Sequence, residues 1–159
     1  MNSSHSILLA SASPRRRELL TQLSIKFKVS AADINESITE AETALDYVVR
    51  MARDKALAGL KQTGGMMPAL GSDTIVLLDG EIFGKPESRS EAESMLQDLS
   101  GQTHHVYSSV ALALKPDNVL EALNITAVTF ADMPAEWITQ YCQSDEPMDK
   151  AGAYAVQGG

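Results

Sequence analysis

The segment at residues 11–20, SASPRRRELL, constrains the fold of this chain most, because it combines a strand end, a helix start and three arginines. The apolar run at 7–10 before it predicts a buried strand. Ser13 is a good N-cap residue, and Pro14 suits the first position of a helix. The sequence therefore predicts a strand, a short turn and a helix that begins at Pro14.

Three arginines, Arg15, Arg16 and Arg17, fall in the first turn of this helix. The positive end of the helix dipole disfavours cations there, at a cost of about 0.3–1 kcal/mol each. A bound phosphate would offset this cost, since helix N-termini and arginine side chains both bind phosphate oxygens. A solvated basic helix start explains the pattern equally well, so this segment alone leaves both interpretations open.

The composition favours a single domain, or two closely joined lobes, with local rather than general binding of phosphate. A chain of 159 residues can bury a proper core. Its net charge of −8 and its few aromatic residues argue against a nucleic-acid surface. No apolar run approaches the ~18 residues of a membrane span and no basic signal-peptide start is present, so we expect a cytoplasmic protein. The single cysteine, Cys142, excludes an internal disulfide and is expected to be a packed thiol.

Along the chain, helical and alternating patterns predict a mixed β-sheet with flanking helices rather than a purely doubly wound fold. Turn residues and helix caps set the expected boundaries. The predicted elements are a strand at 26–30, an acidic loop at 31–42, a helix from Thr43 to Gly64, a hairpin at 70–83 around Asp79 and Gly80, a helix capped by Ser90 and Glu93, strands at 105–114 and 123–130, a helix at 134–141 and a final loop at 144–159. In the first helix, Leu19, Leu20 and Leu23 are expected to form the apolar face.

Three further residues are difficult to explain by packing alone. Asp73 stands at the entrance of an apolar strand and needs a partner, either a cation or backbone N–H groups in a turn. Lys55 borders the apolar stripe of its helix, where it could also simply reach solvent. Lys85, before Pro86, is held on a stiff loop but alone would be an ordinary surface lysine. With the arginines, these residues suit phosphoryl chemistry, in which Asp73 acts as general base or holds a divalent cation.

Several other sites are excluded by the sequence. No P-loop and no dinucleotide-binding glycine motif occurs. His104 and His105 point to opposite faces if they lie in a strand, so they cannot share one metal ion.

Six ordered motifs resemble the Maf family of nucleoside triphosphate pyrophosphatases, from about residue 7 to the end. They are SASPRRRELL, DINES, YVVRMARDKA, GSDTIVLLDGEIFGKP, MLQDLSGQTHHVYSSV and EPMDKAGAYAVQG. The resemblance implies an elongated mixed β-sheet flanked by helices, with two lobes and a cleft, as in inosine triphosphate pyrophosphatases. It also implies hydrolysis of a nucleoside triphosphate to the monophosphate and pyrophosphate with Mg²⁺ or Mn²⁺, and favours a homodimer.

Residue by residue, the resemblance assigns roles to most of the candidates. It implies that Asp73 accepts the proton and that Glu36, together with Asp73, binds the cation. The basic positions around the phosphates match Arg15, Lys55 and Lys85, and Arg16 joins this candidate set from the same helix turn. Substrate choice in the family tracks three positions, which here are Arg15, Thr74 and Gln157 and resemble the branch that acts on dTTP and UTP.

Two alternatives stay open at this point. One is a non-catalytic nucleotide-binding regulator of cell division or septum formation, which would need the basic pocket but not Asp73. The other is a house-cleaning enzyme for modified pyrimidine nucleotides, which would share the mechanism. The resemblance also implies that this chain, a single Maf-like domain over residues 1–159, lacks a C-terminal segment that family members usually carry.

Overall fold

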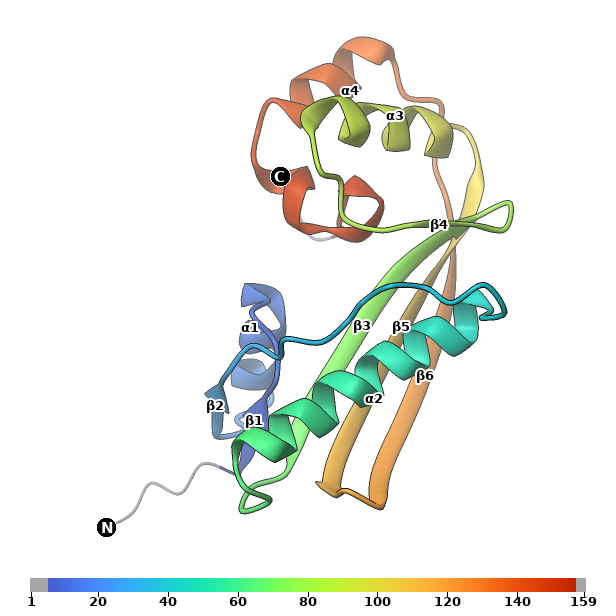
Figure 1. The fold of residues 1–159 in the computed structure, drawn as a ribbon. Coiled ribbons are helices and arrows are strands. Elements are labelled where there is room, and N and C mark those ends of the chain that lie inside the picture. The colour runs from blue at the N-terminus through green and yellow to red at the C-terminus, as the bar shows by residue number, and fades with distance from the viewer. Residues whose placement is uncertain (1–5, 157–159) are drawn as a thin grey trace. The chain divides into compact units, whose positions relative to one another are not determined.

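The computed structural model describes residues 6–156 and divides the chain into two units (Figure 1). The first unit comprises the chain up to Asp73 together with residues 108–123, and the second comprises residues 74–107 and the chain from Asn124 onward. The described residues form one six-stranded sheet with helices, which confirms the predicted mixed α/β class. None of the described helices is both long enough and apolar enough to cross a membrane.

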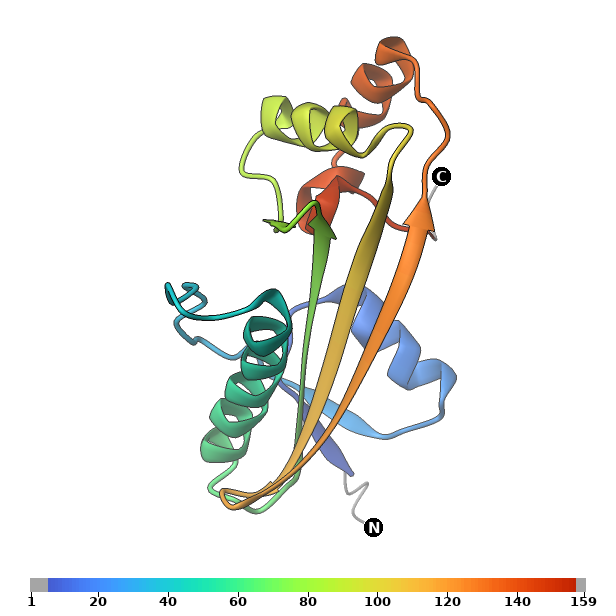
Figure 2. The same cartoon turned by 90° about the vertical axis from the view of Figure 1, so that its right-hand side faces the viewer.

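The first unit is built on short parallel strands. It contains β1 (Ile7–Leu9), α1 (Pro14–Gln22), β2 (Phe27–Val29), α2 (Ala44–Gln62) and the first half of β3 (Ala69–Leu78). Strand β1 pairs in parallel with both β2 and β3, so β1 lies between them. The connecting helices α1 and α2 lie on opposite sides of these strands (Figure 2). The end of β1 therefore lies beside the start of β3, where Leu9 pairs with Leu70.

The predicted starts of α1 and α2 are confirmed by their caps. Ser13 Oγ accepts a hydrogen bond from the Arg16 backbone N–H at 3.4 Å, and Thr43 Oγ1 accepts one from Asp46 at 3.1 Å. The expected apolar face of α1 is wrong in part, because Leu20 is buried while Leu19 is 47% exposed and Leu23 is 69% exposed.

Helix α2 packs very closely on the sheet because small residues line the contact. The buried core of this unit consists of Leu8, Ala52, Ala56, Leu60, Ala69, Ala111 and Ala113. A Cβ added at Gly71 of β3 would lie 2.5 Å from the backbone nitrogen of Ala56 and would also contact the backbone carbonyl of Ala52. The helix therefore packs directly on the backbone of β3. This close packing also brings Lys55, which lies between Ala52 and Ala56 in the sequence, near that strand.

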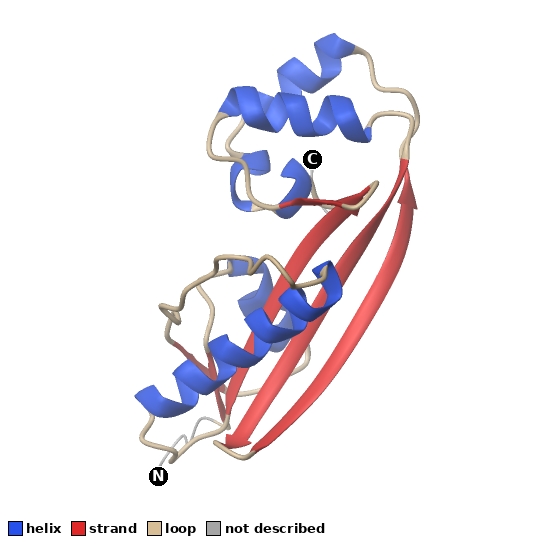
Figure 3. Cartoon of the chain, turned by 45° about the vertical axis from the view of Figure 1, so that its right-hand side comes forward, coloured by secondary structure: helices blue, strands red, loops and turns tan. Residues whose placement is uncertain are grey.

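The second unit contains the second half of β3 and all or part of each remaining element (Figure 3). Strand β4 (Glu81–Phe83) follows the predicted hairpin turn, where Asp79 and Gly80 have φ values of 50° and 81°. The other elements are α3 (Arg89–Leu99), β5 (Thr103–Lys115), β6 (Asn118–Thr129), α4 (Ala135–Cys142) and the 3₁₀ helices η1 (Glu146–Asp149) and η2 (Ala151–Ala153). In the sheet the order is β2-β1-β3-β5-β6, with β4 paired to β3, so β3, β5 and β6 contribute residues to both units.

Several expected boundaries are wrong. Helix α3 is capped by Ser88, whose Oγ accepts from the Glu91 N–H at 3.1 Å, and not by Ser90. Both serines precede a glutamate by three residues, so both match the capping-box pattern. Capping at Ser88 gives the longer of the two possible helices. The last two strands are longer than expected, and the final predicted loop contains η1 and η2.

The core of the second unit contains a buried histidine. His104 Nε2 lies 2.5 Å from Tyr154 Oη, and the His104 ring stacks edge-to-face on Phe130. Burial lowers the pKa of His104, and the nearby His105 lowers it further. His105 is exposed, which confirms that the two histidines face opposite ways. Cys142 is buried, and burial raises the pKa of its thiol, as expected of a packed cysteine.

Candidate active site

A lysine bridges two carboxylates in the first unit. Lys55 Nζ, from α2, lies 2.8 Å from Oε1 of Glu36 in the loop after β2 and 2.9 Å from Oδ1 of Asp73 in β3. The side chains of Lys55 and Asp73 are 13% and 16% exposed, whereas that of Glu36 is 58% exposed. The partner that Asp73 was expected to need is thus an ammonium group.

Asp73 does not stand at the entrance of its strand, as the sequence predicted, but is the fifth residue of β3. The strand begins earlier because Ala69 and Leu70 pair with Leu8 and Leu9 of β1. Its carboxylate therefore comes from a central strand of the sheet, where its position is fixed by the backbone on both sides.

Arg16 joins this cluster from the first turn of α1. Its Nη1 donates to Oγ of the buried Ser11 at 3.2 Å, and the same Oγ accepts from the Ser13 N–H at 3.1 Å. Burial lowers the pKa of Arg16, and the negative charges of Asp73 and Glu36 act in the opposite direction. A guanidinium group remains protonated in proteins, so Arg16 brings a second positive charge to the two carboxylates.

The first helical turn separates the three arginines. Arg15 is partly buried like Arg16, whereas Arg17 is exposed. Arg15 and Arg16 thus both lie in the first turn of α1, and Arg16 lies within reach of the charges of Asp73 and Glu36. Ser11 and Arg16 follow the carboxyl end of β1, and Glu36 follows the carboxyl end of β2. From these two strand ends the chain runs to helices on opposite faces of the sheet (Figure 2). Ligands of open α/β sheets typically bind at such a position.

The loop that carries Glu36 is held in place by α2. Tyr47 Oη donates to the backbone carbonyl of Glu36 at 2.8 Å. Arg50 Nη2 donates to the carbonyl of Ser37 at 2.9 Å, and the same guanidinium forms hydrogen bonds to both carboxylate oxygens of Glu42. These two helix side chains therefore fix the backbone on the C-terminal side of Glu36.

The pKa shifts of Glu42 and Tyr47 agree with these contacts between α2 and the loop. Hydrogen bonding from Arg50 lowers the pKa of Glu42, so that this carboxylate keeps its charge and its pairing. Burial raises the pKa of Tyr47, and the negative charges of Asp73 and Glu36 raise it further. The sequence analysis did not identify Tyr47, Arg50 or Ser11 as residues that support the site. One pattern could have indicated the first two, because Tyr47 and Arg50 are three residues apart and share a helix face.

We expect Arg50→Gln to slow pyrophosphate release from a nucleoside triphosphate about tenfold or more, because side chains that orient a ligand-bearing loop typically contribute this much. The matched control is Arg53→Gln on the same helix, where Arg53 pairs with Glu121 of β6 instead. Rates measured at increasing Mn²⁺ concentration test this expectation. Equal rates for the two variants would contradict the role of Arg50.

The sequence also predicted three further binding residues, Thr74, Lys85 and Gln157. Thr74 follows Asp73 in β3 and, by strand alternation, points to the other face of the sheet. Lys85 is exposed in the loop after β4, in the second unit. Gln157 lies outside the described residues. The binding roles of these three residues, like those of the clustered ones, stay predictions.

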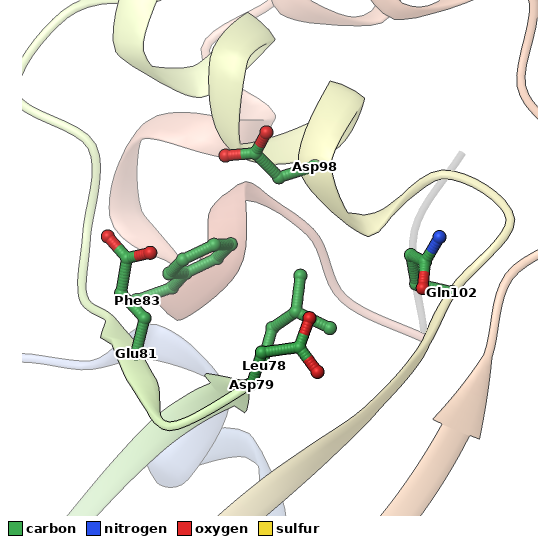
Figure 4. A pocket seen from close by; sticks show the side chains of 6 residues that line it. All are labelled: Leu78, Asp79, Glu81, Phe83, Asp98 and Gln102. Atoms are coloured by element: carbon green, nitrogen blue, oxygen red, sulfur yellow. The ribbon is translucent and has the colours of Figure 1, made fainter.

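A depression of about 350 Å³ in the second unit is less suited to a polyphosphate (Figure 4). It is lined by Leu78, Asp79, Glu81, Phe83, Asp98 and Gln102. Its three carboxylates would repel a triphosphate, which carries the same sign of charge. Lys85 lines an adjacent depression of about 240 Å³, again together with acidic residues.

The cluster of the first unit can supply part of a divalent metal site. The carboxylates of Glu36 and Asp73 converge on one ammonium group, and carboxylate oxygens are suitable ligands for Mg²⁺ or Mn²⁺. No group of three His, Cys, Asp or Glu side chains suited to a metal ion occurs among the described residues. Magnesium is commonly held by one or two carboxylates together with substrate phosphates and waters, so two ligands are sufficient for a metal that binds with a nucleotide.

Comparisons with known proteins agree on the family and the fold. The family model for Maf-like proteins matches residues 6–159. The chain is 50% identical over 153 residues to the dTTP/UTP pyrophosphatase of Escherichia coli K12, an alignment that covers 96% of this chain and 77% of that protein. It is 49% identical, with the same coverage, to a nucleoside triphosphate pyrophosphatase of Shigella flexneri. Among solved structures it is similar to a HAM1 protein from Coxiella burnetii, with a TM-score of 0.55 and 25% identity over 80% of this chain and 74% of that one.

Proposed function

Because the chain belongs to the Maf family, we propose that it hydrolyses dTTP and UTP to the nucleoside monophosphate and pyrophosphate. The observation that carries this proposal is the cluster in the first unit, in which Lys55 bridges Asp73 and Glu36. Arg16 stands nearby in the first turn of a helix. These groups combine anion binding with a carboxylate able to accept a proton.

In this reaction Asp73 removes a proton from a water molecule that attacks the α-phosphorus, and pyrophosphate leaves. General base catalysis needs a carboxylate within hydrogen-bond reach of the water, fixed in position. Asp73 meets the second requirement, since it lies inside a central strand.

The basic residues neutralise the charge of the triphosphate. Arg15 and Arg16 present guanidinium groups at the N-terminus of α1, where backbone N–H groups also favour an anion. Lys55 and Lys85 are the two lysines that we assign to the phosphate oxygens. Glu36 and Asp73 would hold the divalent cation, which when bound supplies further charge stabilisation on the phosphates.

Selectivity for pyrimidine nucleotides is assigned to Arg15, Thr74 and Gln157. A neutral amide at Gln157 can both donate to and accept from the edge of a pyrimidine base, whereas a glutamate cannot donate. We therefore expect Gln157→Glu to lower kcat/KM for dTTP and UTP about tenfold or more, with unchanged thermal stability. Equal selectivity of both proteins across a nucleotide panel would contradict this assignment.

The decisive experiment measures pyrophosphate release from a panel of nucleoside triphosphates with Mg²⁺ or Mn²⁺. We expect dTTP and UTP to be the best canonical substrates. Binding without release would favour a nucleotide-binding regulator of cell division instead. Faster release from modified pyrimidine nucleotides would favour the house-cleaning role. The homodimer and the cytoplasmic location that we expect are separate predictions.

A further inference from the structure

The position of Lys55 between two carboxylates has a consequence for the order of binding. Its Nζ lies within 2.9 Å of one oxygen from each of Glu36 and Asp73, which are the two residues assigned to the metal. With Arg16, the cluster has two positive and two negative groups, so their formal charges cancel. A free divalent cation that enters this cluster meets carboxylates that are already paired.

Binding of such a cation has to break both ion pairs and place Lys55 near a like charge. Two like charges about 4 Å apart repel each other even in a partly solvated site. A triphosphate removes this cost, because its oxygens can accept the hydrogen bonds of the displaced ammonium group. The metal and the nucleotide therefore favour each other at this site.

The structure allows the side chain of Lys55 to move while its backbone stays fixed. Lys55 lies between Ala52 and Ala56, two buried residues that pack directly on the backbone of Gly71. A lysine has a flexible four-carbon stem and a compact ammonium group with three donors, so it can exchange partners by rotamer changes alone. No movement of α2 is required.

We propose that Lys55 is an internal counterion that keeps Glu36 and Asp73 closed to a free divalent cation and releases them when a triphosphate takes over its ammonium group. This inference rests on the proposed function. It predicts positive coupling between metal and nucleotide, which must act equally in both directions.

The test compares Lys55→Gln with Lys61→Gln, an exposed lysine in the last turn of the same helix. Binding of Mn²⁺ is measured by calorimetry, first alone and then with a non-hydrolysable dTTP analogue. We expect Lys55→Gln to bind Mn²⁺ alone about tenfold more tightly than the unchanged chain, as removal of one like charge predicts. The gain in Mn²⁺ affinity caused by the analogue should shrink by the same factor, and turnover should fall. Lys61→Gln should match the unchanged chain.

Equal or weaker binding of Mn²⁺ alone by a folded Lys55→Gln variant would overturn the counterion role. Lys55→Met, which keeps the length of the stem and removes the charge, gives the same comparison if the glutamine variant does not fold. Failure of the proposed function has a different signature, because the unchanged chain would then release no pyrophosphate from dTTP. A merely structural role for Lys55 would lower turnover without raising the affinity for Mn²⁺.

Discussion

Asp73→Asn should abolish pyrophosphate release from dTTP while the nucleotide still binds. The amide keeps the size of the side chain but cannot accept the proton of the attacking water. Loss of a positioned general base typically lowers a rate by about 10²–10⁴-fold. Binding should survive because Arg16 and Lys55 keep their charges, and the loss of one negative group leaves the cluster more attractive to a phosphate. Single-turnover rates and nucleotide affinity, measured separately, test both parts.

The matched control is Asp98→Asn, which makes the same exchange in α3 of the second unit. Asp98 lines the acidic depression of Figure 4, so its variant also asks whether that depression takes part in the reaction. We expect its turnover to equal that of the unchanged chain. Near-normal turnover in Asp73→Asn would remove Asp73 from the chemistry and favour a nucleotide-binding role for the cluster.

Much of the fold could be predicted because its signals are local. Ser13 and Thr43 cap the helices that they were expected to cap, and Asp79 with Gly80 forms the expected turn. Local signals fail where two of them compete, as at Ser88 and Ser90, where both match the same capping pattern. They also fail along β6, whose described side chains are mostly exposed on both faces and therefore show no alternation.

The candidate site was predictable in its residue types but not in its pairings. The cost of a carboxylate at Asp73 and of a lysine at Lys55 was visible in the sequence, yet their contact depends on how α2 rests on β3. Without the resemblance, Glu36 could not be distinguished from the other acidic residues of its loop. The hydrogen bonds that fix the backbone of this loop come from Tyr47 and Arg50 of the following helix, α2. Such distant pairings follow from tertiary packing alone.

Gly71→Ala should destabilise the protein strongly and separate the lysine from its carboxylate. The new methyl group would lie 2.5 Å from the backbone nitrogen of Ala56, and backbone cannot rotate away as a side chain can. Overpacking of a well-packed core costs about 1–3 kcal/mol, and a backbone clash belongs at the upper end. For a chain of this size we expect the melting temperature to fall by roughly 6–12 °C, measured by thermal unfolding.

The matched control is Gly84→Ala, because a Cβ at Gly84 meets no atom within 4 Å. We expect its melting temperature to stay within about 1 °C of that of the unchanged chain. The two variants also separate packing from chemistry. Gly71 lies two residues before Asp73 on the same face of β3, and Ala56 directly follows Lys55. Displacement of α2 should therefore lengthen the contact between Lys55 and Asp73, so the folded fraction of Gly71→Ala should also lose turnover. Full activity per folded molecule would show that the reaction does not depend on this close approach of helix and strand.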